Sequence, residues 1–513
     1  MLKSIRQSTA TLHSWLGLIF GWLLFLIFVM GSLSLYKTEI NYWMQPQFAT
    51  MQTSSNEAAQ SAFAYLQTHA PDAKSWFIHV AHDNAPVNRV FWQTAEGAFE
   101  NRILNASTGS ELQLLNTQGG DFFYRLHFQL YGMSYMTGQI IVTFTAFILL
   151  ILLISGVITH KKLLIEFFTL RTNKGQLSYL DYHTVSAVTA MPFFFVTAFT
   201  GLAMFFYVLF PANLKLSYPD NPFQYFEEIR TIPQQDLLST PEKAEMRPIQ
   251  YFLKHTTRQW GVAPLDTITV KSPNTSSAHI TINKKEDRTI TRNQDQFIFN
   301  AHTGELLKNN RNTSALATLN NGIYGLHMAR YAQPSLRFIL FLSGILGATM
   351  IASGLFLWSL KRQIKNKKQS FHLGAYLVNR LNMTATIGLG IAVLSYFYIN
   401  RLVTAPYNLP NYEITTFFSV WFICFLIACL MPQHQLWKSL LKGFIILALI
   451  LPIINLCYLF NHHLISSFSS YWMFLRVDLL ILLFALLAIF LHQKIAPIAS
   501  NQVTQNQFIN GIR

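Results

Sequence analysis

Residues 138–159 read GQIIVTFTAFILLILLISGVIT, a run of 22 residues without a charged side chain. A helix needs about 20 apolar residues to cross roughly 30 Å of hydrocarbon, so this run is typical of a transmembrane helix. Similar runs recur along the 513-residue chain, which is 51% hydrophobic and only 12% charged, with a mean hydropathy of +0.28. This composition excludes a disordered protein and argues against an ordinary soluble enzyme. The sequence predicts a polytopic α-helical membrane protein.

Eight apolar runs are expected to span the membrane. They lie near residues 14–36, 138–159, 184–210, 337–359, 382–399, 414–432, 443–460 and 472–491. The short segments on one side of these spans carry 16 Lys or Arg residues against two acids, Glu166 and Asp181. The positive-inside rule places that side, with both termini, in the cytoplasm. Because this topology and the anionic lipid bilayer account for the net charge of +15, we do not expect the protein to bind nucleic acid.

Two long hydrophilic stretches on the opposite side predict two small α+β lobes. Alternating apolar residues indicate strands at 75–80, 90–93, 266–270, 279–282 and 296–299, and 58–68 indicates a helix. The expected organisation is helix 1 at 1–37, lobe 1 at 38–125, helix 2 at 126–160, a cytoplasmic loop at 161–183, helix 3 at 184–212, lobe 2 at 213–325, helix 4 at 326–360, a cytoplasmic loop at 361–381, helices 5–8 at 382–493 and a cytoplasmic tail at 494–513.

An internal repeat of span, lobe and span is indicated by four markers that occur twice in the same order. They are a histidine 18 residues before a glycine (His13 and Gly31, His183 and Gly201), an Asn-Ala-x-Thr-Gly turn (105–109 and 300–304), a Tyr-x-Leu-His sequence (124–127 and 324–327) and a Ser-Gly pair (155–156 and 353–354). Residues 1–160 and 183–360 are therefore expected to be two copies of one unit, in which each turn closes a strand on its glycine.

The repeat pairs four of the 16 histidines across the two copies. His13 matches His183 near the inner side of the membrane, and His127 matches His327 near the outer side. If the copies pack about a pseudo-two-fold axis, the members of each pair face one another. The alternative interpretation is that these histidines are ordinary residues of the membrane interface.

Two facing imidazoles in an apolar bundle fit b-type haem better than a bare metal ion. Zinc requires three or four protein ligands, whereas haem iron requires only its axial ligands and the macrocycle buries between helices. His13, His183, His127 and His327 are thus predicted to be axial ligands of two haems, one near each face. His160 and His372 are alternatives for the inner site. Cations that could bind the propionates are Arg125 and Arg330 near the outer pair, and Arg6 and Lys174 near the inner pair.

These residues resemble a known family. The opening Leu12-His13-Ser14-Trp15-Leu16-Gly17-Leu18, Met30-Gly31, the two turns, Leu126-His127, Leu326-His327 and the Ser-Gly pairs are similar to bacterial PepSY-associated transmembrane proteins, which include iron-regulated inner-membrane proteins and ferric-siderophore reductases. The resemblance covers about residues 1–400. It implies two periplasmic PepSY lobes, a four-helix core that holds b-type haem, and reduction of a ferric siderophore in the periplasm. No Gly-rich nucleotide motif follows a strand, so the electron donor is expected to be separate, either quinol or a flavoprotein.

Two further functions are compatible with the sequence. The lobes could bind peptide or regulate a protease without catalysis, or the duplicated halves could form a transporter, with Arg476 and Asp478 as intramembrane charges. Residues 121–136, which are rich in aromatic side chains, and residues 322–331 are the expected docking site for a chelate under the reductase interpretation.

Overall fold

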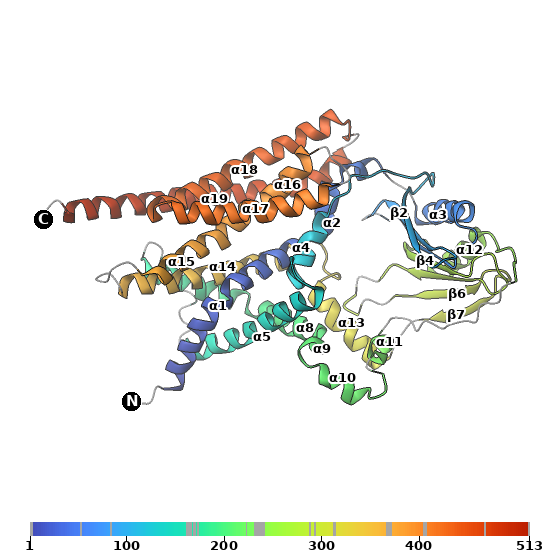
Figure 1. Cartoon of the computed structure of the whole chain (residues 1–513), viewed down its shortest axis with the longest axis horizontal. Coiled ribbons are helices and arrows are strands. Elements are labelled where there is room, and N and C mark those ends of the chain that lie inside the picture. The colour runs from blue at the N-terminus through green and yellow to red at the C-terminus, as the bar shows by residue number, and fades with distance from the viewer. Residues whose placement is uncertain are drawn as a thin grey trace. The chain divides into compact units, whose positions relative to one another are not determined.

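The computed structural model divides the described residues into two compact units (Figure 1). Unit 1 comprises residues 1–46, 116–209 and 334–513, and unit 2 comprises residues 47–115 and 210–333. The structure describes residues 4–51, 54–82, 85–160, 167, 171, 174–221, 223–229, 242–286, 289–291, 294–310, 314–365, 372–403, 408–465 and 468–510. Large parts of the expected cytoplasmic loops, including Lys161 and Lys162, lie outside these residues.

Unit 1 is a helical assembly. Its helices are α1 (Ile5–Ser34), α2 (Lys37–Met44), α4 (Gly119–Phe128), α5 (Tyr135–Thr159), α7 (Gln176–Thr189), α8 (Met191–Met204), α9 (Phe206–Leu209), α14 (Pro334–Lys365), α15 (Leu373–Met383), α16 (Leu389–Leu402), α17 (Leu409–Leu430), α18 (Gln433–Asn461) and α19 (Phe468–Asn510). A π-helical turn, Thr384–Gly388, joins α15 to α16. Helix α1 packs against α5 and α14, and α14 packs against α7. The two copies of the repeat therefore share one helical core.

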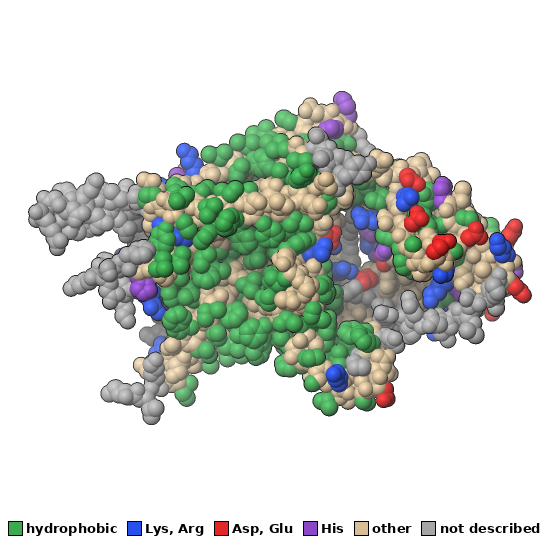
Figure 2. Space-filling model, viewed as in Figure 1, with side chains coloured by type: hydrophobic (Ala, Val, Ile, Leu, Met, Phe, Trp, Pro, Cys, Tyr) green, Lys and Arg blue, Asp and Glu red, His purple; other side chains and the backbone are tan. Residues whose placement is uncertain are grey.

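The predicted membrane spans are confirmed. Seven of the described helices are long and apolar enough to cross a membrane, and the bent pair α7 and α8 brings the number to eight. The pair bends by 66° at Ala190, where Pro192 at the start of α8 lacks the N–H that would continue the helix. In Figure 2 the visible face of unit 1 is largely hydrophobic, as expected for a surface in contact with lipid.

Several boundaries differ from the sequence-based expectation. Helix α7 begins at Gln176, so His183 lies inside a helix and not at the end of a loop. His127 lies in the last turn of the short helix α4, and His327 in the last turn of α13 (Ala315–Met328); each of these helices ends before the long helix that follows. The breaks contain residues with positive φ, Leu130 and Gly132 after α4 and Ala329 after α13, which end a helix.

Unit 2 contains one seven-stranded antiparallel sheet in the order β3-β2-β1-β4-β5-β6-β7. The strands are β1 (Ser75–His79), β2 (Val87–Gln93), β3 (Phe99–Asn105), β4 (Leu265–Lys271), β5 (His279–Lys284), β6 (Gln296–Asn300) and β7 (Leu306–Asn310). The helices of the unit are α3 (Ser55–His69), α10 (Pro211–Ser217), α11 (Gln224–Ile229), α12 (Ile249–Trp260) and α13, and a 3₁₀ turn spans Pro46–Thr50. The strands expected from alternation are all present.

The two predicted lobes join into one sheet, because β1 of the first copy pairs with β4 of the second. Apolar side chains of α3 and α12 cover one face of this sheet and form a common core with Trp76, Ile268 and Phe297. Both repeated turns have the expected form: Asn105 Oδ1 accepts hydrogen bonds from the backbone N–H of Ser107 and Thr108, and Gly109 follows at φ +71°. Asn300 and Gly304 repeat this geometry with a φ of +81°.

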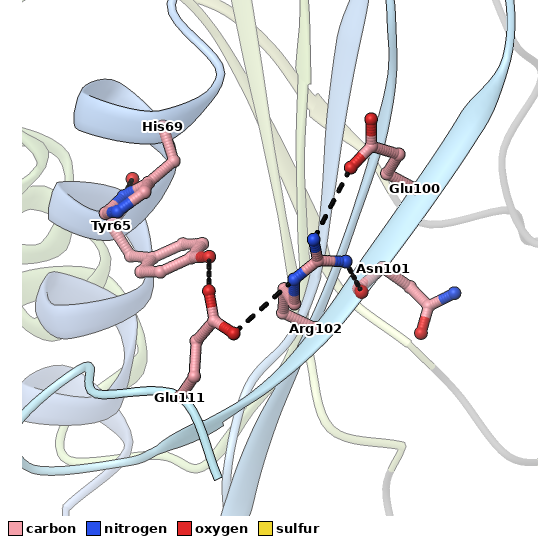
Figure 3. Close-up of polar contacts among 6 residues, drawn as sticks. All are labelled: Tyr65, His69, Glu100, Asn101, Arg102 and Glu111. Atoms are coloured by element: carbon pink, nitrogen blue, oxygen red, sulfur yellow. Dashed lines mark hydrogen bonds and ion pairs between the residues drawn. The ribbon is translucent and has the colours of Figure 1, made fainter. Parts of the chain in front are cut away.

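A polar cluster on the covered side ties α3 to β3 and to the segment after it (Figure 3). The Tyr65 hydroxyl donates to Glu111, and Arg102 forms an ion pair of 3.5 Å with the same carboxylate. The His69 ring stacks on Tyr65 with 4.0 Å between centroids. Partial burial, followed by the hydrogen bond to Glu111 and its negative charge, raises the pKa of Tyr65 to about 12.

This cluster predicts a loss of stability at high pH. The pKa of Tyr65 is about 12 in the folded protein and about 10 in an unfolded chain, so the contribution of its neutral form is complete below pH 10 and is lost as the pH rises towards 12. We expect Tyr65→Phe to flatten this part of the stability curve, and Glu111→Gln to make Tyr65 ionise at lower pH. Unfolding measured across this pH range gives the first effect, and phenolate absorption of Glu111→Gln against the parent protein gives the second. Identical titrations of parent and Glu111→Gln would contradict the assignment.

Candidate functional site

The structure brings His13 on α1 and His183 on α7 together, with 6.2 Å between ring centroids and 81° between ring planes. Imidazole nitrogens bind metal ions at about 2.0–2.1 Å, and ring atoms joined by bonds near 1.33 Å lie about 1.1 Å from the ring centre. Two imidazoles on opposite sides of one metal ion therefore have centroids about 6.3 Å apart. A direct hydrogen bond of about 2.9 Å between the rings would instead give about 5.1 Å. The observed separation is therefore longer than a direct hydrogen bond between the two rings would give.

Backbone carbonyls set the tautomer of both histidines. His13 Nδ1 lies 3.1 Å from the carbonyl oxygen of Leu152 and 3.0 Å from Ser155 Oγ, and His183 Nδ1 lies 2.7 Å from the carbonyl oxygen of Met350. A carbonyl oxygen can only accept, so Nδ1 carries the proton and Nε2 keeps its lone pair. Histidines that bind metals in proteins are commonly oriented in this way. Both rings are therefore prepared to act as ligands through Nε2.

The repeated glycines give these histidines access to the backbone. In each case the carbonyl that accepts from the histidine lies four residues before a glycine, and the imidazole ring packs on that glycine. The carbonyl and glycine are Leu152 and Gly156 for His13, Met350 and Gly354 for His183, and Ile27 and Gly31 for His127. Helical side chains tilt towards the preceding turn, so a larger residue at the glycine would shield the carbonyl. This contact accounts for the glycine of the Ser-Gly pair in both copies and for Gly31 in the first copy.

Alanine substitutions at these glycines should destabilise the protein in a graded order. An added Cβ would lie 2.7 Å from His127 at Gly31, 3.1 Å from His183 at Gly354 and 3.4 Å from His13 at Gly156. We expect Gly31→Ala to cost about 1–3 kcal/mol by overpacking, Gly354→Ala less, and Gly156→Ala least. Gly443 in α18 is the control, because an added Cβ there meets nothing within 4 Å and the change should stabilise the helix by about 0.5–1 kcal/mol. Unfolding in detergent measures the series, and equal shifts at Gly31 and Gly443 would contradict it.

A cavity of about 350 Å³ lies against the two rings. Its walls come from α1, α5, α7, α8 and α14 and are mainly apolar, and ligand sites in proteins have volumes of roughly 300–1,000 Å³. Arg6 and Lys361 line the cavity, whereas Lys174, expected from the sequence to lie near this pair, is exposed and is not one of the lining residues that are described. Two cations thus line this cavity, and one of them, Lys361 of α14, was not predicted from the sequence.

The alternative inner histidines differ in position. His160 lines the cavity beside Trp358, its counterpart in the repeat, and therefore remains an alternative ligand. His372 is exposed at the start of α15 and is not among the described lining residues. The sequence disfavours His160, because Trp358 breaks the symmetry of the repeat at that position, yet His160 and not His372 is among the described lining residues.

The residues predicted for the outer site lie in different units. His127 belongs to unit 1, where its Nδ1 lies 2.9 Å from the carbonyl oxygen of Ile27, and His327 belongs to unit 2. Arg125 is exposed, with its guanidinium 5.4 Å from the centre of the Tyr131 ring, and Arg330 forms an ion pair of 3.0 Å with Glu286. The pairing of His127 with His327, and the role of the two arginines, stay predictions.

The expected docking segment 121–136 is partly core. Phe122 and Phe123 are fully buried, and Phe122 stacks on Tyr396 of α16 with 4.8 Å between centroids. These two rings cannot meet a chelate, because they fill the contact between α4 and the later spans. Within the described residues, no group of three or more His, Cys, Asp or Glu side chains could hold a metal ion, so the histidine pair is not part of a larger ligand cluster.

The last four spans contain a buried polar network that the sequence analysis missed. Asp478 of α19 accepts from Asn455 at 2.8 Å, Asn455 accepts from Arg401 at 2.8 Å, and Arg401 also donates to Asn400. Asn400 donates to Glu413 of α17 at 2.9 Å. An acid at the start of an apolar run is a signal for such a network, because charges inside membranes are rarely left unpaired.

The network binds two segments of the first copy that lead to and from its β-strands. These are α2, before the strands, and the residues directly before α4, after them. Glu413 accepts from the Thr117 hydroxyl at 2.6 Å and from the Gln118 N–H at 2.9 Å, directly before α4. Trp43 of α2 donates to Asp478 at 2.9 Å, and its carbonyl accepts from Arg401. Asp478, considered above as part of a transport path, is thus engaged in anchoring α2.

These features define a class of protein: a polytopic helical membrane protein with an internal repeat, a histidine pair in its helical core and an extramembrane antiparallel sheet. The family model described as PepSY-associated TM region matches residues 10–361, which include nearly all of both copies of the repeat. The chain belongs to this family. No curated protein matches the chain.

Proposed function

We propose that the protein is a b-type haem protein of the bacterial inner membrane that carries electrons across the bilayer and reduces a ferric siderophore on the periplasmic side, with release of Fe(II). The observation that carries this proposal is the His13–His183 pair, with 6.2 Å between its rings and both Nδ1 atoms engaged by backbone carbonyls. Both termini would then be cytoplasmic, and the sheet of unit 2 periplasmic, as the loop charges favour.

The inner cavity fits haem in its chemistry. It offers two imidazoles with free Nε2 lone pairs, apolar walls suited to a porphyrin, and the cations Arg6 and Lys361 for carboxylates. A bare divalent metal ion would need further ligands, and the described residues supply no cluster of three. When bound, haem iron accepts and donates single electrons.

The protein's own residues would determine where the cofactor lies and how it is oriented. His13 and His183 would bind the iron, and Leu152 and Met350 would hold the two rings in place through their carbonyls. Leu18, Leu149 and Ile351 would exclude water from the cavity. Burial and these second hydrogen bonds are the features by which a protein sets the potential of haem iron.

A second haem at the outer side, bound by His127 and His327, follows from the repeat. The two sites together would allow electrons to cross roughly 30 Å of membrane, which one haem could not span. One electron from a separate donor, quinol or a cytoplasmic flavoprotein, would reduce one Fe(III) to Fe(II), which oxygen-rich chelators hold less tightly.

Absorption spectroscopy of the purified protein tests the proposal. In detergent, we expect a Soret band together with α and β bands that sharpen on addition of dithionite, and a haem-to-protein ratio near two. A ferric chelate added to the reduced protein, once excess dithionite is removed, should accept electrons as Fe(III) is reduced to Fe(II) and so reoxidise the haem. Protein that stays colourless after expression with added haem would overturn the proposal and favour a binding or transport function.

A further inference from the structure

The sheet of unit 2 has two chemically different faces. Alternate residues of each strand point to opposite faces, and α3 and α12 cover the face that carries Trp76, Val90 and Ile280. The other face, which we call the open face, carries the remaining residues of each strand. Its central row, defined by strand register, is Asn101, Phe91, Phe77, Thr269, Thr281 and Ile298.

Aromatic rings gather on the first-copy half of the open face. Phe77 and Phe99 lie 6.3 Å apart between centroids, and His79 packs edge-on against Phe91 at 5.8 Å. Phe99 is 65% exposed, and Phe77 and Phe91 are half-buried. Large exposed aromatic side chains on a sheet are a frequent feature of ligand-binding surfaces.

The charged side chains at register-paired positions of the open face are all positive. Arg89 lies in register beside His79, and Lys271 lies in register beside His279. Among the positions of the seven described strands that register assigns to the open face, none is an Asp or Glu; Asp266 lies in the β-bulge between Leu265 and Thr267, where its carboxylate accepts from Gln294 at 3.2 Å. Glu100 and Arg102 point to the covered face, where Arg102 lies 5.6 Å from the Trp92 ring. The segregation of charge is therefore a property of the fold and not of the overall composition.

We propose that the open face binds an anionic, aromatic ligand, and that its occupant is a ferric chelate with catecholate donors. Catecholate rings would pack on Phe77, Phe91 and Phe99, while Arg89 and Lys271 would balance the net negative charge of the complex. A ferric hydroxamate, which lacks aromatic donor rings and net charge, complements neither feature. This inference rests on the proposed function for the choice of an iron chelate as the ligand.

Equilibrium dialysis of the full-length protein in detergent tests this inference. The probes are ferric tris-catecholate and ferric tris-acetohydroxamate, with bound iron measured directly. We expect the catecholate complex to bind at least tenfold more tightly and to weaken as salt is raised. Equal affinity for the two complexes would overturn the proposal.

Three variants locate the binding site. Arg89→Gln is expected to weaken catecholate binding about three- to tenfold, a change of up to about 1.4 kcal/mol, and Phe91→Leu should weaken it while retaining apolar volume. Arg102→Gln, on the next strand but on the covered face, is the matched control and should leave binding unchanged. Equal effects of Arg89→Gln and Arg102→Gln would refute the assignment. The assay requires no haem, so a colourless protein that binds catecholate would refute only the proposed function, and a haem protein that binds no catecholate would refute only this inference.

Discussion

Replacement of His183 by alanine is expected to remove haem from the inner cavity and leave haem at the outer side, which halves the haem-to-protein ratio. His183 and His13 line this cavity, and the Nδ1 atom of each lies within hydrogen-bond distance of a backbone carbonyl, which leaves Nε2 as the ligand atom. Alanine leaves iron without that ligand, and no carboxylate or thiolate cluster among the described residues can replace it. His13→Ala should have the same effect, because the two rings act as a pair.

His160→Ala is the matched control, since His160 lines the same cavity. We expect this variant to keep both haems. His183→Met should retain the inner haem and raise its potential, because Met is also an axial ligand of haem iron. Pyridine-haemochrome quantification and a redox titration measure these outcomes. Loss of the inner haem in His160→Ala but not in His183→Ala would show that the ligand assignment is wrong.

The same reasoning predicts the outer variants. His127→Ala or His327→Ala should remove one haem and leave the inner one reducible from the cytoplasmic side. An unchanged haem ratio in both variants would remove the basis for an outer site. These variants also test the pairing across the repeat, which follows from sequence position alone.

Local signals in the sequence were sufficient to predict the membrane spans, the internal repeat and the proximity of His13 and His183. Apolar run length reports a membrane helix directly, and the repeated Ser-Gly spacing reports the glycine on which each histidine packs. His13 and His183 could be paired because the repeat aligns them. The start of α7 at Gln176 was not predicted, since apolar character alone does not mark where a helix begins in polar sequence.

Long-range contacts could not be predicted in the same way. The β1–β4 pairing joins Ser75 to Lys271, and nothing local in either strand specifies that partner. The network around Glu413 likewise joins polar residues from four spans, each of which looks isolated in its own apolar run. Lys361 was missed because the cavity is formed by helix packing and not by sequence proximity.

The second large effect is expected at Glu413, which is fully buried and accepts three hydrogen bonds. Glu413→Ala leaves the Thr117 hydroxyl, the Gln118 N–H and the Asn400 amide without their acceptor, at about 1–3 kcal/mol for an unpaired buried group. It also removes a negative charge from the surroundings of the buried Arg401. We expect the free energy of unfolding to fall by roughly 3–5 kcal/mol, as it does when one partner of a buried charged pair is removed.

Two variants make this prediction specific. Glu413→Gln retains an acceptor oxygen and should cost less than Glu413→Ala. Asp121→Ala, on the same helix α4, removes a half-exposed ion pair with Lys37 of 2.5 Å and should cost no more than about 1 kcal/mol. Unfolding in detergent gives the stabilities. Similar losses in Glu413→Ala and Asp121→Ala would show that the network is dispensable.

Loss of Glu413 should also disturb the position of His127. Glu413 binds the chain directly before α4, and His127 lies in the last turn of that helix. Tyr396 supports the same segment through its hydroxyl, which donates to the Gly119 carbonyl at 2.8 Å. Loss of Glu413 should therefore increase hydrogen exchange in residues 119–128 well before it affects α1 or α14. Faster exchange confined to α4 would show that the last four spans, α16–α19, position this helix. Faster exchange throughout unit 1 would show that Glu413 contributes only to the overall stability of the unit.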